Sequence, residues 1–178
     1  MKGRQSIDGL VGEGQAGEGR MRLERCSQRQ IERLAVTIAS LSKKGDLVLL
    51  SGPLGAGKTT LARAFIRQLI SDLSAEIPSP SYTLAQSYAP ADGVGPMVWH
   101  FDFYRIEDPS EITELGLEEA QAEGVVLAEW PEHAGSALAG GGLLISLALA
   151  NRPRERQVTI ENLGGWSDRL KLLEQAMR

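Results

Sequence analysis

The sequence is poor in the residues that build disulfides and transition-metal sites. Cys26 is the single cysteine among 178 residues, so no internal disulfide can form, and with only two histidines a zinc site is not expected. No apolar run approaches the roughly 18 residues that a membrane-spanning helix requires, and the first residues lack the apolar core of a signal peptide. These absences argue against a disulfide-rich secreted protein, a zinc protein and a membrane protein, and we expect a cytoplasmic location.

The chain also lacks an excess of positive charge. Its 19 Lys and Arg residues face 23 Asp and Glu residues, which gives a net charge of −4, and they form no dense basic block. Binding to nucleic acid phosphates depends on clustered cations, so any connection to RNA should run through a partner. The remaining composition, 42% hydrophobic and 24% charged, is that of an ordinary globular domain.

The domain organisation is simple. Residues 1–20 are rich in Gly, Gln and Glu and poor in apolar side chains. We therefore expect a disordered tail over residues 1–22 and one domain over residues 23–178. The sequence contains no internal repeat.

One stretch carries a specific motif. After the apolar run 47–51, residues Gly52–Thr59 match G-x-x-x-x-G-K-[ST], the phosphate-binding loop or P-loop. Glycines let successive backbone N–H groups converge on phosphate oxygens at a helix N-terminus, Lys58 would supply a charge to the outer phosphates, and Thr59 a hydroxyl to magnesium. The predicted nucleotide contacts are Gly52, Leu54, Gly55, Ala56, Gly57, Lys58, Thr59 and Thr60. The alternative is a glycine-rich turn that binds nothing.

Apolar periodicity predicts alternating helices and strands around this motif. Expected helices cover 27–42, 58 to about 73, 110–122 with a break at Gly116, and 168–177; expected strands cover 47–51, 84–88, 97–104, 124–129, 143–149 and 156–161. Such alternation behind a phosphate-binding loop is typical of an α/β fold. We predict a single P-loop domain with a mostly parallel sheet flanked by helices.

Two acidic residues follow predicted buried strands. Asp102 follows the apolar residues 98–101 near the end of the strand at 97–104, and Glu129 ends the strand at 124–129. Magnesium beside a phosphate-binding loop is held by an acid at the carboxyl end of a neighbouring strand, so both are candidates. Each could instead cap the following turn. Because no Asn-Lys-x-Asp segment is present to read guanine, we prefer ATP to GTP as the nucleotide.

The segment Ser79–Thr83 is a candidate switch loop. Pro80 within it and Pro78 just before it keep the segment out of a helix, and it lies where other nucleotide hydrolases place a threonine that senses the γ-phosphate. Its candidate residues are Ser79, Pro80, Tyr82 and Thr83. A rigid entry into an edge strand is the alternative.

Several other residues have less specific interpretations. His100 is expected to be a structural hydrogen-bonding residue, and His133 a solvated loop residue. Arg152, Arg154 and Arg156 alternate, which predicts a solvated strand face or a phosphate clamp.

Four motifs taken together resemble the TsaE family, also called YjeE. They are Gly52–Thr60, Ser79–Leu84 (Ser-Pro-Ser-Tyr-Thr-Leu), His100–Arg105 (His-Phe-Asp-Phe-Tyr-Arg) and the pair Glu129-Trp130. The resemblance covers residues 27–162. The first motif occurs in many families, whereas the ordered set is far more specific.

The resemblance implies a small P-loop α/β domain that hydrolyses ATP slowly with Mg²⁺ as cofactor. Members work with the TsaB and TsaD proteins to place a threonylcarbamoyl group on adenosine 37 of tRNAs that read codons beginning with A. Carried over by motif, Lys58, Asp102 and Glu129 are catalytic, Thr59 and Glu129 hold magnesium, and Trp130 lines the nucleotide site. Contact with tRNA is expected only through the complex.

The resemblance is not complete, and other functions stay open. The family's N-terminal helix carries a threonine near the nucleotide, whereas residues 29–32 here read Arg-Gln-Ile-Glu, so the adenine contacts are not predicted. One alternative function is a small-molecule kinase with Arg152, Arg154 and Arg156 as lid residues. Another is a nucleotide-gated binding module that does not hydrolyse ATP.

Overall fold

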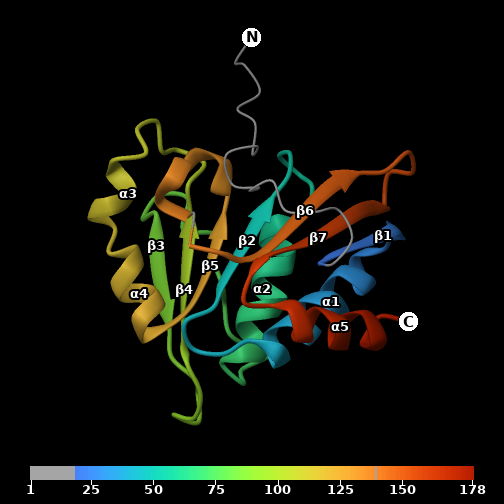
Figure 1. The fold of residues 1–178 in the computed structure, drawn as a ribbon, viewed down its shortest axis with the longest axis horizontal. Coiled ribbons are helices and arrows are strands. Elements are labelled where there is room, and N and C mark those ends of the chain that lie inside the picture. Colours follow the sequence, from blue (N-terminus) through green and yellow to red (C-terminus); the bar gives the residue numbers. More distant parts are fainter. Residues whose placement is uncertain (1–18, 139) are drawn as a thin grey trace.

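A single mixed β-sheet with helices on both faces forms the protein, as seen in a computed structural model that describes residues 19–138 and 140–178 (Figure 1). The seven strands are β1 (Arg20–Cys26), β2 (Leu47–Ser51), β3 (Ala85–Tyr88), β4 (Met97–Asp102), β5 (Gly124–Glu129), β6 (Gly142–Leu149) and β7 (Arg156–Gly164). The α-helices are α1 (Gln28–Leu41), α2 (Lys58–Leu69), α3 (Glu111–Glu114), α4 (Leu117–Glu123) and α5 (Ser167–Ala176). Short 3₁₀ turns cover Pro131–His133 and Gly135–Leu138.

The strand order is β1-β7-β6-β2-β5-β4-β3. The four central strands, β6, β2, β5 and β4, run parallel, while β1, β7 and β3 pair antiparallel at the edges. The predicted α/β class is confirmed, with antiparallel edges added to the parallel centre. Parallel strands end at one edge of the sheet, and the register there sets Asp102 of β4 directly beside Glu129 of β5.

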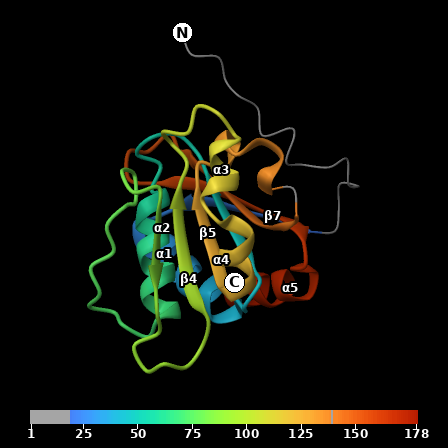
Figure 2. The ribbon, with the colours of Figure 1, turned by 90° about the vertical axis from the view of Figure 1, so that its left-hand side faces the viewer.

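Every residue of β2 is buried, because helices cover both sides of the sheet. Val48 and Leu50 face the apolar cluster under α1 and α2, whereas Leu47 and Leu49 face the cluster under α3 and α4. Figure 2 shows the two helix layers on either side of β4 and β5. A strand buried on both faces has the continuous apolar sequence of a parallel-sheet strand.

The helix boundaries follow local signals. Ser27 is the N-cap of α1 and forms a capping box with Gln30, which agrees with the helix start expected at residue 27. Gly116 adopts φ = +67° and separates α3 from α4, which confirms the predicted break. The helix α2 ends at Leu69, earlier than the predicted residue 73, because the chain turns at Ser71 with φ = +57°.

The predicted tail over residues 1–22 is too long. Residues from Arg20 onward form β1, which pairs with β7 and buries Met21 against Ile160. Only Met21 and Leu23 mark this strand among charged neighbours, so its own sequence gives a weak signal, and the pairing with β7 stabilises it. Residues 1–18 lie outside the described part of the chain.

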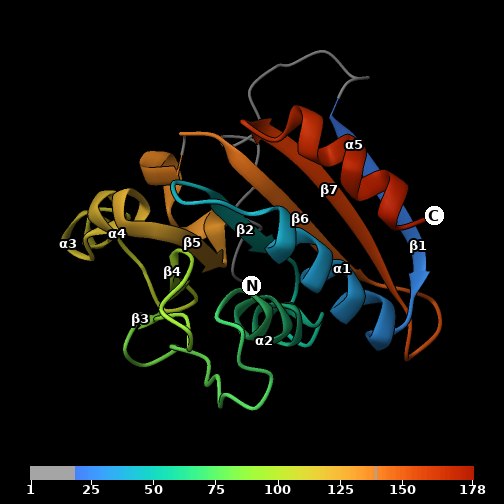
Figure 3. The same ribbon diagram turned by 90° about the horizontal axis from the view of Figure 1, so that it is seen from below.

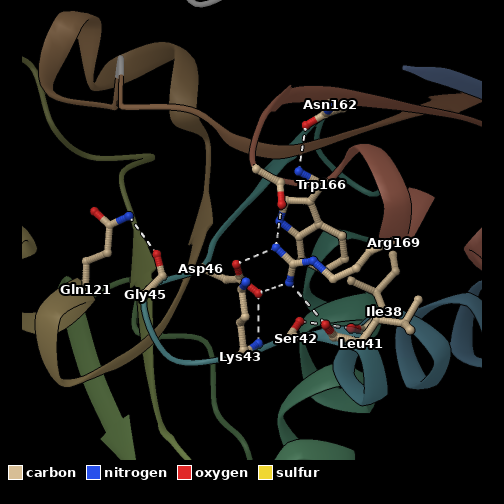
Figure 4. Close-up of polar contacts among 11 residues, drawn as sticks. Ile38, Leu41, Ser42, Lys43, Gly45, Asp46, Gln121, Asn162, Trp166 and Arg169 are labelled. Carbon is tan, nitrogen blue, oxygen red and sulfur yellow. Dashed lines mark hydrogen bonds and ion pairs between the residues drawn. The ribbon is translucent and has the colours of Figure 1, made fainter. Parts of the chain in front are cut away.

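The C-terminal helix α5 lies along α1 and the β7–β1 edge (Figure 3). Its Arg169 forms an ion pair with both carboxylate oxygens of Asp46, just before β2, and also donates to the carbonyls of Leu41 (3.1 Å) and Gly165 (2.7 Å) (Figure 4). The guanidinium lies 3.9 Å from the centroid of the Trp166 ring. These contacts connect three segments that are distant in sequence. None of the helices in the described residues has the length and apolar character needed to cross a membrane.

Candidate functional site

The glycine-rich loop, Gly52–Gly57, joins the end of β2 to the start of α2. Gly52 adopts φ = +135°, and a Cβ there would lie 2.2 Å from the carbonyl oxygen of Leu147. Gly57 adopts φ = +108° immediately before α2. Glycine is therefore required for steric reasons at the first position and for its conformation at the second.

The start of α2 presents free backbone donors. Gly57 has no side chain to cap the helix, and the first N–H groups of any helix have no partner within it. The helix dipole places partial positive charge at the same end. Ala56 N–H donates to the carbonyl of Pro53 (3.1 Å), which closes the loop into a tight turn. The arrangement suits a bound anion.

Lys58 is buried and turned back over the loop. Its Nζ donates to the carbonyls of Gly52 (2.6 Å) and Pro53 (3.1 Å), and lies 3.5 Å from the centroid of the Trp130 ring. Burial lowers the pKa of Lys58, while the nearby acids, Glu129 foremost, act in the opposite direction. Charge-assisted bonds to phosphate are stronger than these bonds to neutral carbonyls, so an outer phosphate would compete well for the ammonium group.

Glu129 lies at the centre of a buried polar chain. Its Oε2 accepts a hydrogen bond from the Thr59 hydroxyl (3.0 Å), and its Oε1 lies 3.1 Å from Nε2 of His100. His100 is fully buried, which confirms its predicted structural role, and it fixes the orientation of the carboxylate. Hydroxyl and carboxylate oxygens are the ligands Mg²⁺ prefers, and Thr59 and Glu129 place one of each together.

Asp102 connects the sheet edge to the candidate switch loop. Its Oδ2 accepts from the Ser79 hydroxyl (2.8 Å), and its Oδ1 accepts from the N–H of Tyr104 (3.1 Å). Its carboxylate is therefore directed towards the segment 79–83, whereas that of Glu129 is directed towards Thr59. The two acids share the sheet edge and have different partners.

A cavity of about 490 Å³ opens over these groups and is the main cavity of the candidate site. Its lining comprises Leu54, Gly55, Gly57, Lys58, Thr59, Thr60, Ser79, Ser81, Tyr82, Asp102, Tyr104, Arg105, Glu129 and Trp130. The structure thus brings the predicted acids, Lys58, Trp130 and part of the switch loop to one place. Four predicted residues do not line it: Gly52, Ala56, Pro80 and Thr83.

Aromatic side chains form one wall of the cavity. Tyr104 packs against Trp130, with ring centroids 4.8 Å apart, and His133 packs edge-on against the same tryptophan. His133 is half-buried and its Nδ1 lies 3.1 Å from the carbonyl oxygen of Ile106, so the predicted solvated role is wrong. The cavity role of Tyr104 was missed, although its position two residues after Asp102 was a usable signal.

The candidate switch loop is exposed at its tip. The Tyr82 side chain is 82% exposed, and the Arg105 guanidinium lies 4.1 Å from its ring centroid. The loop closes through a hydrogen bond from Leu84 N–H to the carbonyl of Pro80 (2.7 Å) and continues into β3. Behind the tip, Pro80 is buried and the Ser79 hydroxyl is bonded to Asp102, so the base of the loop is held against the sheet edge.

The three alternating arginines have different surroundings in the structure. Arg152 is exposed and pairs with Glu155, and Arg154 is exposed as well. Arg156 instead contacts the outer side of the glycine-rich loop, next to a second hollow of about 480 Å³. That hollow also adjoins Ser27 and Arg29 of the α1 region. The predicted solvated strand face is therefore wrong for Arg156, and none of the three lines the main cavity.

Comparison with known proteins identifies the family. The family described as "Threonylcarbamoyl adenosine biosynthesis protein TsaE" matches residues 26–158. The tRNA threonylcarbamoyladenosine biosynthesis protein TsaE of Bacillus subtilis is 36% identical over 136 residues, which are 76% of this chain and 81% of that protein. The TsaE of Streptomyces coelicolor is 34% identical over 138 residues, 75% of this chain and 91% of that one.

Other relatives are matched over less of their length. The TsaE of Rickettsia conorii is 39% identical over 106 residues, so the match spans 60% of this chain and 58% of that protein. Among solved structures, Bacillus subtilis YdiB superposes with a TM-score of 0.69 at 27% identity, covering 92% of this chain and 97% of that chain. The chain belongs to the TsaE family, whose members take part in tRNA threonylcarbamoyladenosine biosynthesis.

Proposed function

We propose that the protein binds Mg-ATP in the main cavity and hydrolyses it slowly in support of threonylcarbamoyl transfer to tRNA. The observation that carries this proposal is the convergence of the loop amides, Lys58, and the Thr59–Glu129 pair at the carboxyl edge of parallel strands. Open α/β sheets bind their ligands at this edge. Family membership supplies the pathway.

Each group has a distinct role in binding the triphosphate. The free amides at the start of α2 would receive phosphate oxygens, and Lys58 would exchange the carbonyls of Gly52 and Pro53 for the outer phosphates. Thr59 and Glu129 would hold magnesium, which when bound neutralises charge on the phosphate oxygens. His100 keeps Glu129 oriented, and Asp102 offers a second carboxylate on the side of the switch loop.

Hydrolysis by the chain alone is expected to be slow. Arg105 borders the cavity, but its guanidinium is stacked on Tyr82 rather than extended towards the glycine-rich loop. A supplied arginine is worth roughly 10³–10⁵ in rate in other P-loop hydrolases. We propose that TsaB and TsaD complete or order the site, and that tRNA is reached only through that complex, in keeping with the net charge of −4.

A small-molecule kinase is not proposed. Its expected lid arginines, Arg152, Arg154 and Arg156, do not line the main cavity. A binding module that does not hydrolyse ATP would share the same site and would differ only in turnover.

The test combines calorimetry with capture from a bacterial extract. Mg-ATP should bind the wild-type protein, and Lys58→Ala should lose most of the affinity, while Lys44→Ala, an exposed lysine outside the cavity, should not. TsaB and TsaD should be recovered in a nucleotide-dependent manner. A folded wild-type protein that binds no ATP would refute the proposal, and recovery of neither partner would refute the part that concerns the complex.

A further inference from the structure

We propose that Arg156 is a positioning residue that holds the glycine-rich loop in its anion-binding shape. The inference rests on the proposed function, because the shape matters only if the loop receives phosphates. Arg156 is the first residue of β7, 99 residues beyond Gly57, and it makes no contact with Lys58, Thr59 or Glu129 in the hydrogen-bond network.

The guanidinium of Arg156 bridges two loops through backbone carbonyls. On one side, Nε donates to Ala56 (3.0 Å) and Nη2 donates to Gly55 (3.2 Å). On the other side, Nη1 donates to Pro153 (3.2 Å) and Glu155 (2.9 Å) in the β6–β7 connection. All three guanidinium nitrogens thus donate hydrogen bonds, and every acceptor is a backbone carbonyl oxygen rather than a side chain.

These bonds determine the direction of the neighbouring amides. The described peptide bonds are trans, so a carbonyl and the next residue's N–H point in opposite directions. Because Arg156 draws the Ala56 carbonyl outwards, the Gly57 N–H is directed away from Arg156. Because it draws the Gly55 carbonyl outwards, the Ala56 N–H is directed to the Pro53 carbonyl, which it reaches at 3.1 Å.

The loop needs such an outside restraint. Gly55 and Gly57 adopt φ = +76° and +108°, and a Cβ at either position would meet nothing within 4 Å. Glycines with free space around them leave the intervening peptides able to rotate. The Arg156 fork therefore supplies the orientation that the loop sequence does not.

Arg156 itself is firmly placed. Its backbone pairs with Leu149 of β6 on one side and with Cys26 of β1 on the other. An arginine fork has fixed geometry and five donors, whereas lysine offers a single flexible ammonium group, so lysine cannot reproduce bonds to both loops. The positive charge behind the loop also favours an anion in front of it.

The experiment compares Arg156→Ala and Arg156→Lys with Arg152→Ala, an exposed arginine on the same β6–β7 connection that does not contact the glycine-rich loop. Calorimetry measures the affinity of each variant for Mg-ATP and for magnesium tripolyphosphate, which lacks the nucleoside. Hydrogen exchange measures the exchange rates of the backbone amides of residues 54–58 in the absence of nucleotide. We expect Arg156→Ala to weaken both ligands about tenfold or more and to speed exchange, Arg156→Lys to give intermediate values, and Arg152→Ala to change neither.

Two results would overturn the inference. One is unchanged exchange and affinity in Arg156→Ala with its circular dichroism intact; if that variant unfolds, Arg156→Lys carries the same test. The other is a loss confined to ATP, with tripolyphosphate unaffected, which would place Arg156 at a nucleoside contact. Failure of the wild-type protein to bind either ligand would instead defeat the proposed function, and faster exchange in Arg156→Ala would still support the restraint on the loop.

Discussion

The ammonium group of Lys58 lies 3.5 Å from the centroid of the Trp130 ring, so a cation proposed to bind phosphate rests on an aromatic wall of the same cavity. The contact is a cation–π interaction, and it is made by a buried lysine that also donates to two loop carbonyls. A ligand that attracts the ammonium group must change the surroundings of the indole.

Binding of Mg-ATP is therefore expected to change the fluorescence of Trp130. Titration should give the same dissociation constant by fluorescence and by calorimetry. Lys58→Ala should weaken binding by roughly 2–4 kcal/mol, the cost of losing charge-assisted contacts, or about 30- to 700-fold. Trp99 and Trp166 serve as internal controls. In Trp130→Phe, their emission should remain, and the fluorescence change on binding Mg-ATP should be lost. A signal that survives in Trp130→Phe would contradict this prediction.

The lowered pKa of Lys58 gives a pH prediction. Burial, its largest cause, disfavours the charged form in the free protein, whereas bound phosphates would favour it. ATP binding at alkaline pH should thus take up a proton, and affinity should fall as pH rises through the lowered pKa, below the usual 10.5 for lysine. Calorimetry in buffers of different ionisation enthalpy measures the uptake. Equal uptake in Lys58→Ala would assign the proton to another group.

Glu129 rather than Asp102 should be the acid closest to magnesium. Glu129 contacts the Thr59 hydroxyl, whereas Asp102 contacts Ser79. Titration of Mn²⁺ with ATP present should show a larger loss of metal affinity in Glu129→Gln than in Asp102→Asn. The reverse order would exchange their roles. Both variants replace a carboxylate by its amide of the same shape, so they are matched in size.

The sequence predicted this site in large part because its signals are local. Asp102 and Glu129 each follow an apolar run, and parallel strands bring such ends together without further information. The bond between Ser79 and Asp102 and the contact of Arg156 with Ala56 join residues 23 and 100 positions apart. No periodicity encodes such pairs, because they depend on the path of the loops.

In the fold as well, the edge strand β1 and the helix α5 depend on contacts between segments that are distant in sequence. Residues 20–22, the first part of β1, were predicted to belong to a tail, since the strand is stabilised by pairing with β7 rather than by its own pattern. The helix α5 was predicted from its apolar spacing, but its attachment through Arg169 and Asp46 was not. An isolated Asp in a turn and an Arg on a helix carry no sequence signal for each other.

The Arg169–Asp46 pair should contribute to stability. The two side chains are 16% and 8% exposed, and Asp46 also accepts from the N–H of Lys43. Removing one partner leaves a partly buried charge, so Arg169→Ala should lower the free energy of unfolding by roughly 3 kcal/mol. Urea denaturation measures this change in the free energy of unfolding. Lys171→Ala removes an exposed pair with Asp168 on the same helix and should cost under about 0.5 kcal/mol.

The last prediction concerns how partners act on hydrolysis. Ser79 holds the switch loop to Asp102, while Tyr82 and Thr83 are exposed at the loop tip. A partner that contacts the tip could therefore move the Ser79–Asp102 contact and release Arg105 from Tyr82 without disturbing Lys58. Prolines limit the conformations that the loop loses on ordering, which lowers the cost of such a change.

Steady-state ATPase assays with and without TsaB and TsaD should show stimulation in the wild-type protein. Tyr82→Ala and Thr83→Ala should lose most of that stimulation and keep ATP affinity within about twofold, because Thr83 does not line the cavity and the largely exposed Tyr82 borders it only from the loop tip. Ser87→Ala, an exposed residue on β3 that does not line the cavity, is the matched control and should be stimulated normally. Fast turnover by the isolated chain, indifferent to both partners, would contradict the coupling role of the loop and favour a self-sufficient hydrolase.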